Sequence, residues 1–162
     1  MKAAILMGSK SDYPIVQKAE DMLKDFGVET EIRIISAHRT PNVASEFALK
    51  AEENGIEVII AAAGKAAHLA GVIAAFTPLP VIAIPIKSST LDGLDSLLSM
   101  VQMPKGIPVA TVAIDGAENA GLLAVQILSL KYPALRAAMK EYKAKMEKEI
   151  IATDAEFQKS RQ

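Results

Sequence analysis

The sequence predicts an α/β fold in which helices cover a parallel, doubly wound sheet. Short apolar runs alternate with helical patterns along nearly the whole chain, and strands that run in the same direction need such crossover helices. The hydrophobic fraction is 51% but the aromatic fraction only 4%, which indicates a core of small aliphatic side chains packed between helices and a parallel sheet. A chain of 162 residues fits one domain, residues 1–162.

The first half of the chain repeats a unit of strand, loop and helix. The expected strands are residues 3–7, 28–35 and 58–62, and the expected helices are residues 14–26, 43–51 and a short helix that reaches residue 75. Pro14 suits a first helical turn because its missing N–H is not needed there, and Gly27 suits the left-handed residue after a helix end. Each apolar run is thus followed by a helix that can cross the sheet.

The second half continues the alternation and ends in two long helices. The expected strands are residues 81–84 and 109–114, and the expected helices are residues 94–101, 119–130 and 133–150. Residues 119–130 are apolar nearly all round, which fits either a deeply buried helix or one shared with another subunit. Because a domain of this size has little interior, we expect oligomerisation. Helix 133–150 is expected to pack on neighbouring subunits, and the last dozen residues to be loosely held.

Composition and missing motifs exclude several classes of protein. A net charge of −1 leaves no broad basic surface for nucleic acid. The absence of cysteine excludes disulfides and thiolate metal sites, and two histidines without an HExxH pattern disfavour a bound metal. There is no signal-peptide core or membrane span, so we expect a cytoplasmic protein without a membrane partner. NTPase, dinucleotide and hydrolase fingerprints are missing too.

Three polar segments directly follow the first three expected strands. They are Gly8–Asp12, Ser36–Pro41 and Gly64–His68. Ligands on doubly wound sheets bind at the carboxyl ends of the strands. We therefore expect the three segments to converge on one cleft.

The first segment, MGSKSD, has the features of an anion site. Gly8 lets a ligand approach the backbone, Ser9 and Ser11 supply hydroxyl donors, and the N–H groups of the following helix point outward at its positive end. Asp12 would repel a phosphate, so a ligand role for it means accepting hydrogen bonds from sugar hydroxyls. A plain helix cap at Ser11 or Asp12 explains the local pattern equally well.

The other two segments carry the two histidines. Arg39 in SAHRTP offers a planar fork for phosphate, and its charge favours a neutral His38 that can take up a proton. A structural histidine beside a solvated arginine is the alternative, although the position after a strand favours function. In GKAAHLAG, Lys65 and His68 border small residues against which a flat ring could lie. A solvated lysine and a space-filling histidine are the alternatives there.

Taken together, MGSKSD, SAHRTP, AGKAAHLAG and DSLLSMVQMPKGIPVATVAI (residues 95–114) resemble the bacterial N5-carboxyaminoimidazole ribonucleotide mutases of purine biosynthesis. The resemblance implies a flavodoxin-like three-layer fold, a homo-octamer, no cofactor and a small ribonucleotide substrate. It also implies roles for single residues. Ser9, Ser11 and Arg39 would hold the phosphate and Asp12 the ribose, Gly64, Ala66, Ala67 and His68 would frame the ring and carboxylate, Gly8 and Ser36 would complete the binding set, and His38 would be the general acid/base.

The mechanism that this resemblance implies is a decarboxylation followed by recarboxylation at carbon C4. The family usually has Gly in place of Lys65 and Pro in place of Ala70, and we expect the Lys65 ammonium to point outward. Animal-type relatives carboxylate aminoimidazole ribonucleotide directly with CO2 and carry Lys in place of Arg39. Direct carboxylation and a non-catalytic sensor of phosphorylated ligands are the alternative functions.

Overall fold

Five parallel strands form the central sheet of the computed structural model, which describes residues 1–161. The strands are β1 Lys2–Met7, β2 Glu29–Ile34, β3 Val58–Gly64, β4 Val81–Ile86 and β5 Ala110–Thr111. Their order across the sheet is β2-β1-β3-β4-β5, which is the flavodoxin-like order with a switch point between β1 and β3. The predicted fold class is therefore confirmed.

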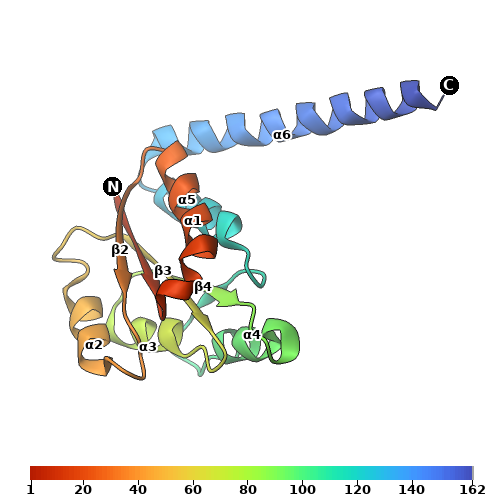
Figure 1. The fold of residues 1–162 in the computed structure, drawn as a ribbon. Helices are drawn as coiled ribbons and strands as arrows, with labels where there is room; N and C mark the ends of the chain where they lie inside the picture. Colours follow the sequence, from red (N-terminus) through yellow and green to blue (C-terminus); the bar gives the residue numbers. More distant parts are fainter. Residues whose placement is uncertain (162) are drawn as a thin grey trace.

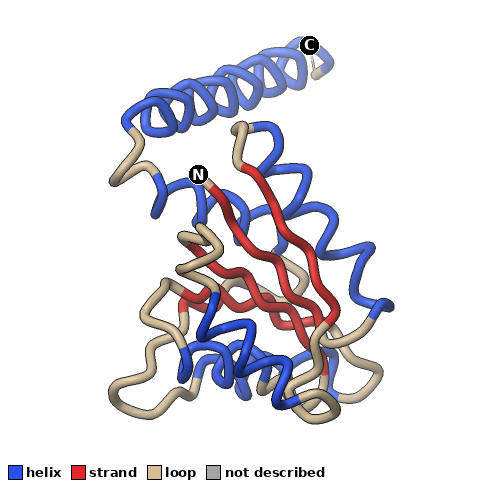
Figure 2. Tube along the Cα trace, turned by 90° about the vertical axis from the view of Figure 1, so that its left-hand side faces the viewer, coloured by secondary structure: helices blue, strands red, loops and turns tan. Residues whose placement is uncertain are grey.

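Helices cover both faces of the sheet, so that the domain has three layers (Figures 1 and 2). The helices are α1 Tyr13–Asp25, α2 Pro41–Lys50, α3 Leu69–Phe76, α4 Leu94–Val101, α5 Ala117–Leu128 and α6 Pro133–Ser160, with 3-10 turns η1 Lys10–Asp12 and η2 Leu91–Gly93. Successive strand residues point to opposite faces. Ile5 accordingly belongs to the core beneath α1 and α5, and Leu6 to the core beneath α2 and α3.

The apolar helix α5 is buried within its own chain. Six of its residues are buried, and it packs against α1 and the sheet. Gly121 makes this close approach possible, because a Cβ atom there would lie 2.9 Å from Met22 Cβ and 3.0 Å from the carbonyl oxygen of Ala19. The apolar character of α5 is thus explained by packing within this chain, so α5 alone does not indicate a second subunit, and oligomerisation stays a prediction.

The two ends of the second half also differ from the sequence predictions. Only Ala110–Thr111 pair with β4, whereas we expected a strand over residues 109–114. Helix α6 continues to Ser160, so residues 151–160 are helical rather than loosely held, and Gln162 lies outside the described residues. Beyond Met139 this helix buries no residue in the domain and projects away from it (Figure 1). Within residues 1–161, no helix combines the length and apolarity needed to cross a membrane.

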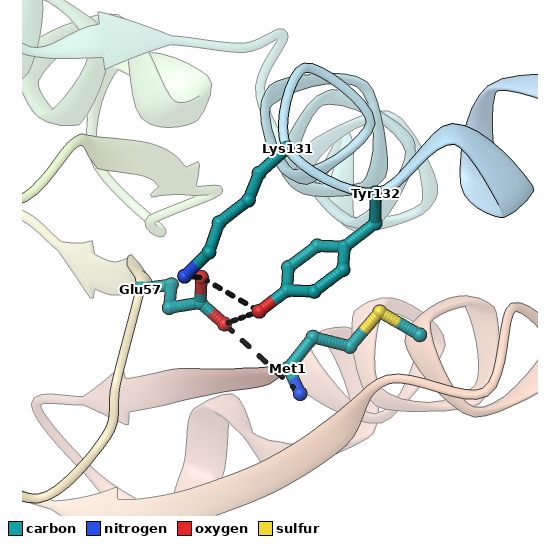
Figure 3. Close-up of polar contacts among 4 residues, drawn as sticks. All are labelled: Met1, Glu57, Lys131 and Tyr132. Carbon is teal, nitrogen blue, oxygen red and sulfur yellow. Dashed lines mark hydrogen bonds and ion pairs between the residues drawn. The ribbon is translucent and has the colours of Figure 1, made fainter.

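A cluster of polar groups fixes the corner from which α6 leaves the domain (Figure 3). The Glu57 carboxylate accepts hydrogen bonds from Lys131 Nζ at 2.7 Å and from the Tyr132 hydroxyl at 2.8 Å. The amino group of Met1 lies 4.0 Å away. Partial burial raises the pKa of Glu57, but these hydrogen bonds and charges outweigh burial and hold the pKa below its usual value. The anchor lies at the amino end of the sheet.

Replacement of Gly121 by alanine is expected to destabilise the fold by about 1–3 kcal/mol, because the new methyl group meets backbone as well as Met22. Alanine is ordinarily the better helix former, so a decrease in the free energy of unfolding would have to come from the packing clash and not from helix propensity. Urea unfolding measures the change. The matched control is Gly71→Ala in α3, where the methyl group meets only the flexible end of Met103 and little stability should be lost. Equal stability of both variants would contradict the packing argument.

Candidate active site

A cleft of about 660 Å³ lies at the carboxyl edge of the sheet. The segments that follow β1, β2, β3 and β4 meet there. Its lining consists of Gly8, Ser9, Ser11, Asp12, Ser36, Ala37, His38, Arg39, Ala63, Gly64, Lys65, Ala66, His68, Leu69, Ile86, Lys87, Ser88 and Ser89. The predicted convergence of the three polar segments is confirmed, and the segment after β4 is a fourth contributor.

The segment after β1 presents serine hydroxyls and a carboxylate to the cleft. The Ser11 hydroxyl lies 2.9 Å from Ser9 Oγ and 3.1 Å from Asp12 Oδ1. Ser9 Oγ also accepts a bond from the Ser11 backbone N–H, which caps the turn η1. Asp12 makes no side-chain cap bond to α1. The cap is therefore at Ser9 of the preceding turn and not at Asp12, which leaves the Asp12 carboxylate available to a ligand.

Asp12 is a buried carboxylate, only 8% exposed. Burial raises its pKa above the usual value, and hydrogen bonds from Ser11 and from the Ser9 backbone oppose the rise without cancelling it. The carboxylate holds no ion pair among residues 1–161. A buried anion with spare acceptor capacity is suited to bind ligand hydroxyl groups.

The segment after β2 forms a tight turn closed by its own hydroxyl groups. Thr40 Oγ1 donates to the Ser36 carbonyl at 2.9 Å and accepts from the Ser36 N–H at 3.0 Å. Arg39 Nε donates to Ser36 Oγ at 3.2 Å, and Arg39 Nη2 donates to the Gly8 carbonyl at 2.7 Å. The guanidinium thus bridges the segments after β1 and β2, and its remaining N–H groups have no partner among residues 1–161, so they can bind an anion.

His38 and His68 form a pair that sequence reasoning did not anticipate. His38 Nε2 lies 3.0 Å from His68 Nδ1, and the rings meet nearly edge to face. One nitrogen must donate and the other accept, so a single proton joins the two rings. Both side chains are exposed to the cleft. The pair is therefore equipped to hold and pass a proton beside a ligand.

The segment after β3 supplies a wall with little side-chain bulk. Gly64 and Ala66 line the cleft, whereas Ala67 is fully buried and is not part of the lining. Lys65 is exposed and has a φ of 58°, a left-handed conformation that favours glycine. It forms no ion pair within residues 1–161. Ala67 is the one predicted site residue that is not in the cleft lining, and Lys65 is among the lining residues.

Sequence reasoning missed the segment after β4. Lys87, Ser88 and Ser89 follow an apolar strand, and this is the same signal that revealed the first three segments. The Lys87 N–H donates to Asp115 Oδ1 at 2.9 Å, and its ammonium pairs with Asp92 at 3.3 Å. The cleft therefore has a fourth wall held by contacts to the segments before α4 and α5.

Asp12→Asn is expected to raise stability at neutral pH and to weaken ligand binding. The folded-state pKa of Asp12 is raised, so its stabilising contribution is present at low pH and is lost as the pH rises through that pKa. Asparagine removes this cost, and the melting temperature at pH 7 should rise by a few degrees. The gain should shrink below about pH 4. Thermal unfolding of both proteins between about pH 4 and pH 7 measures this difference in melting temperature.

The same variant should bind ribose 5-phosphate about tenfold more weakly, because a hydrogen bond to a charged acceptor is lost. Asp25→Asn, an exposed carboxylate at the far end of α1, is the matched control and should change neither property. A lower melting temperature for Asp12→Asn at pH 7 would mean that the Ser11 bond outweighs the burial cost.

Comparison with known proteins identifies the family of the chain. The AIR carboxylase family matches residues 2–149. A Thermotoga maritima relative named N5-carboxyaminoimidazole ribonucleotide mutase is 57% identical, over 93% of this chain and 88% of the relative. A Saccharomyces cerevisiae relative named phosphoribosylaminoimidazole carboxylase is 53% identical, over 91% of this chain and 26% of the relative. The crystal structure of Treponema denticola PurE has a TM-score of 0.86 at 33% identity, with 96% and 97% of the two chains covered. The chain belongs to the AIR carboxylase family.

Proposed function

We propose that this chain is a mutase that converts N5-carboxyaminoimidazole ribonucleotide to 4-carboxy-5-aminoimidazole ribonucleotide in purine biosynthesis. The observation that carries the proposal is the cleft itself, in which anion-binding groups and a histidine pair share one volume. Relatives named as this mutase, with more than half of the aligned residues identical, support it. A cytoplasmic location, which the cysteine-free composition permits, completes the proposal.

The phosphate is proposed to bind beside Ser9, Ser11 and Arg39. Serine hydroxyls and a guanidinium are donors that match phosphate oxygens, and the three residues lie on adjoining segments. Asp12 accepts hydrogen bonds from the ribose hydroxyls. The small residues Gly64 and Ala66 leave room for the flat imidazole ring.

His38 is proposed to be the general acid/base. The N–carboxylate bond of the carbamate breaks and releases CO2, and protonated His38 donates its proton to the exocyclic nitrogen. Carbon C4 of the freed aminoimidazole then attacks this CO2, and His38 takes up the C4 proton, so that the proton count balances. One ring nitrogen of His38, Nε2, lies 3.0 Å from Nδ1 of His68, and this contact orients the His38 imidazole. Keeping CO2 beside its acceptor spares a bimolecular encounter, an effect worth up to roughly 7–11 kcal/mol in well-oriented systems.

Direct carboxylation of aminoimidazole ribonucleotide by CO2 is the second candidate. It is favoured by the Saccharomyces cerevisiae relative, which is named a carboxylase and is 53% identical. Both reactions form the same C4 carboxylate and need the same proton removal. They differ only in the donor of CO2, so the choice depends on the substrate supplied.

Turnover of two substrates distinguishes these functions. The carbamate, and separately aminoimidazole ribonucleotide with bicarbonate, are supplied at limiting enzyme, and C4 carboxylate formation is followed. The mutase should turn over the carbamate faster. Faster turnover of the bicarbonate mixture would replace the mutase by the carboxylase, and no turnover of either would contradict both.

His38→Ala belongs in the same assay. It should lower kcat by about 10²–10⁴-fold, the usual range for general acid/base catalysis, while aminoimidazole ribonucleotide still binds. Thr40→Ser keeps the turn beside His38 and should keep full activity. Unchanged turnover in His38→Ala would exclude this histidine as the base.

We further propose that copies of this chain assemble, as an octamer, through α4 and α6. Leu94, Leu98 and Val101 form an exposed stripe along α4, since residues three and four apart share one helix face. Helix α6 exposes Met146, Ile150, Ile151 and Phe157, and none of its residues after Met139 is buried in the domain. Neighbouring copies would cover both surfaces.

Analytical ultracentrifugation should give eight times the 17.2 kDa chain mass. A chain that ends at Lys143 should keep the fold, because residues 144–161 are exposed and the packing of Tyr142 on Phe26 is retained, but it should form smaller species. A monomer at micromolar concentration of the full chain would contradict the assembly.

A further inference from the structure

Ser88 is a buried polar residue of the cleft wall to which the proposed function assigns no role. It lies two residues after β4, lines the cleft and is 8% exposed. A hydroxyl group buried in a ligand cleft must satisfy its hydrogen-bonding capacity either within the protein or with the ligand.

The hydrogen of this hydroxyl is already used within the protein. Ser88 Oγ contacts the Thr90 carbonyl oxygen, and it lies 3.1 Å from each carboxylate oxygen of Asp95. All of these partners are acceptors only, so Ser88 must donate to them. Among residues 1–161, no donor reaches the Ser88 oxygen in return. The oxygen therefore faces the ligand as an acceptor and not as a donor.

The position of Asp95 allows its carboxylate to accept the Ser88 hydrogen and so leave the Ser88 oxygen as an acceptor. It lies in the first turn of α4, where the positive end of the helix favours a carboxylate. The neighbouring residue Lys87 is fixed separately, because its N–H donates to Asp115 Oδ1 at 2.9 Å. The segment that carries Ser88 is thus tied to the starts of both α4 and α5.

We propose that Ser88 accepts a hydrogen bond from a donor group of the bound ligand, and that Asp95 is the positioning residue that fixes Ser88 in this role. A phosphate dianion offers acceptors only, so the donor is a ribose hydroxyl or the amino group of the aminoimidazole ring. The choice of ligand rests on the proposed function. The acceptor role of Ser88 rests on the contacts to Thr90 and Asp95.

Ser88→Ala tests the proposal through three dissociation constants, measured by calorimetry with aminoimidazole ribonucleotide, ribose 5-phosphate and inorganic phosphate. The loss of one hydrogen bond should raise the dissociation constant about three- to tenfold. A rise for both sugar phosphates identifies a ribose hydroxyl as the donor, and a rise for the ribonucleotide alone identifies the amino group. Unchanged binding of both sugar phosphates, or an equal loss for inorganic phosphate, would overturn the proposal.

The matched control is Ser96→Ala. Ser96 is a buried serine of α4 that donates to the Ile86 carbonyl at 2.9 Å, so its removal loosens the same wall without changing the cleft lining. It should lower the melting temperature and leave the three constants unchanged. If Ser96→Ala weakened ribonucleotide binding as much as Ser88→Ala, the effect of Ser88 would be structural, which would overturn the acceptor role.

Asp95→Asn tests the positioning role, because an amide can donate to Ser88 and occupy the acceptor oxygen. It should weaken the same ligands as Ser88→Ala, and the double variant should be no weaker than Ser88→Ala alone. Additive effects would overturn the role of Asp95. If the wild-type chain binds ribose 5-phosphate but not aminoimidazole ribonucleotide, the proposed function fails while the ribose 5-phosphate measurements still decide the role of Ser88.

Discussion

The common direction of the five strands is the constraint on which the cleft depends, because it brings every carboxyl end to one edge of the sheet. The hydrogen-bond ladder continues one residue past β1 and β2. The Gly8 N–H donates to the Ala62 carbonyl at 3.1 Å, and the Ile35 N–H donates to the Met7 carbonyl at 2.9 Å. The segments that carry the serines and His38 therefore start from fixed backbone positions, and the short distances between their side chains follow from the register of the sheet.

Sequence periodicity was sufficient to predict the sheet, the first four helices and three of the four cleft segments, because these features depend on local apolar patterns. Two of the features it missed, the histidine pair and the role of Ser88, depend on contacts between distant residues. His38 and His68 are thirty positions apart in sequence and meet only when β2 and β3 flank β1. The acceptor role of Ser88 depends on its contact with Asp95 on α4. The extent of α6 was missed because exposed helical residues give no apolar stripe that marks where the helix ends.

Residues with strained backbone conformations are distributed differently between the two edges of the sheet. In the turns that lead into β2 and β3, the left-handed positions are occupied by Gly27 and Gly55, where they cost little. At the carboxyl edge, non-glycine residues take such conformations, namely Lys65, Leu91, Asp92 and Asp115, at roughly 1–3 kcal/mol each. The buried Asp12 carboxylate adds a further cost at the same edge. The destabilising features thus lie at the carboxyl edge and not at the amino edge. This distribution indicates that the carboxyl edge is shaped for a ligand.

Arg39 connects the two chemical tasks of the cleft. Its guanidinium donates to Gly8 on one segment and to Ser36 on the other, while its neighbour His38 contacts His68 on a third. Under the proposed function, an anion held by Ser9, Ser11 and Arg39 would clamp the segment that carries His38. Binding energy from the non-reacting phosphate would then orient the base beside the ring, where an error of about 1 Å is costly. A flexible lysine could supply the charge at this position but not the two directed bonds, so the fork of Arg39 contributes geometry as well as affinity.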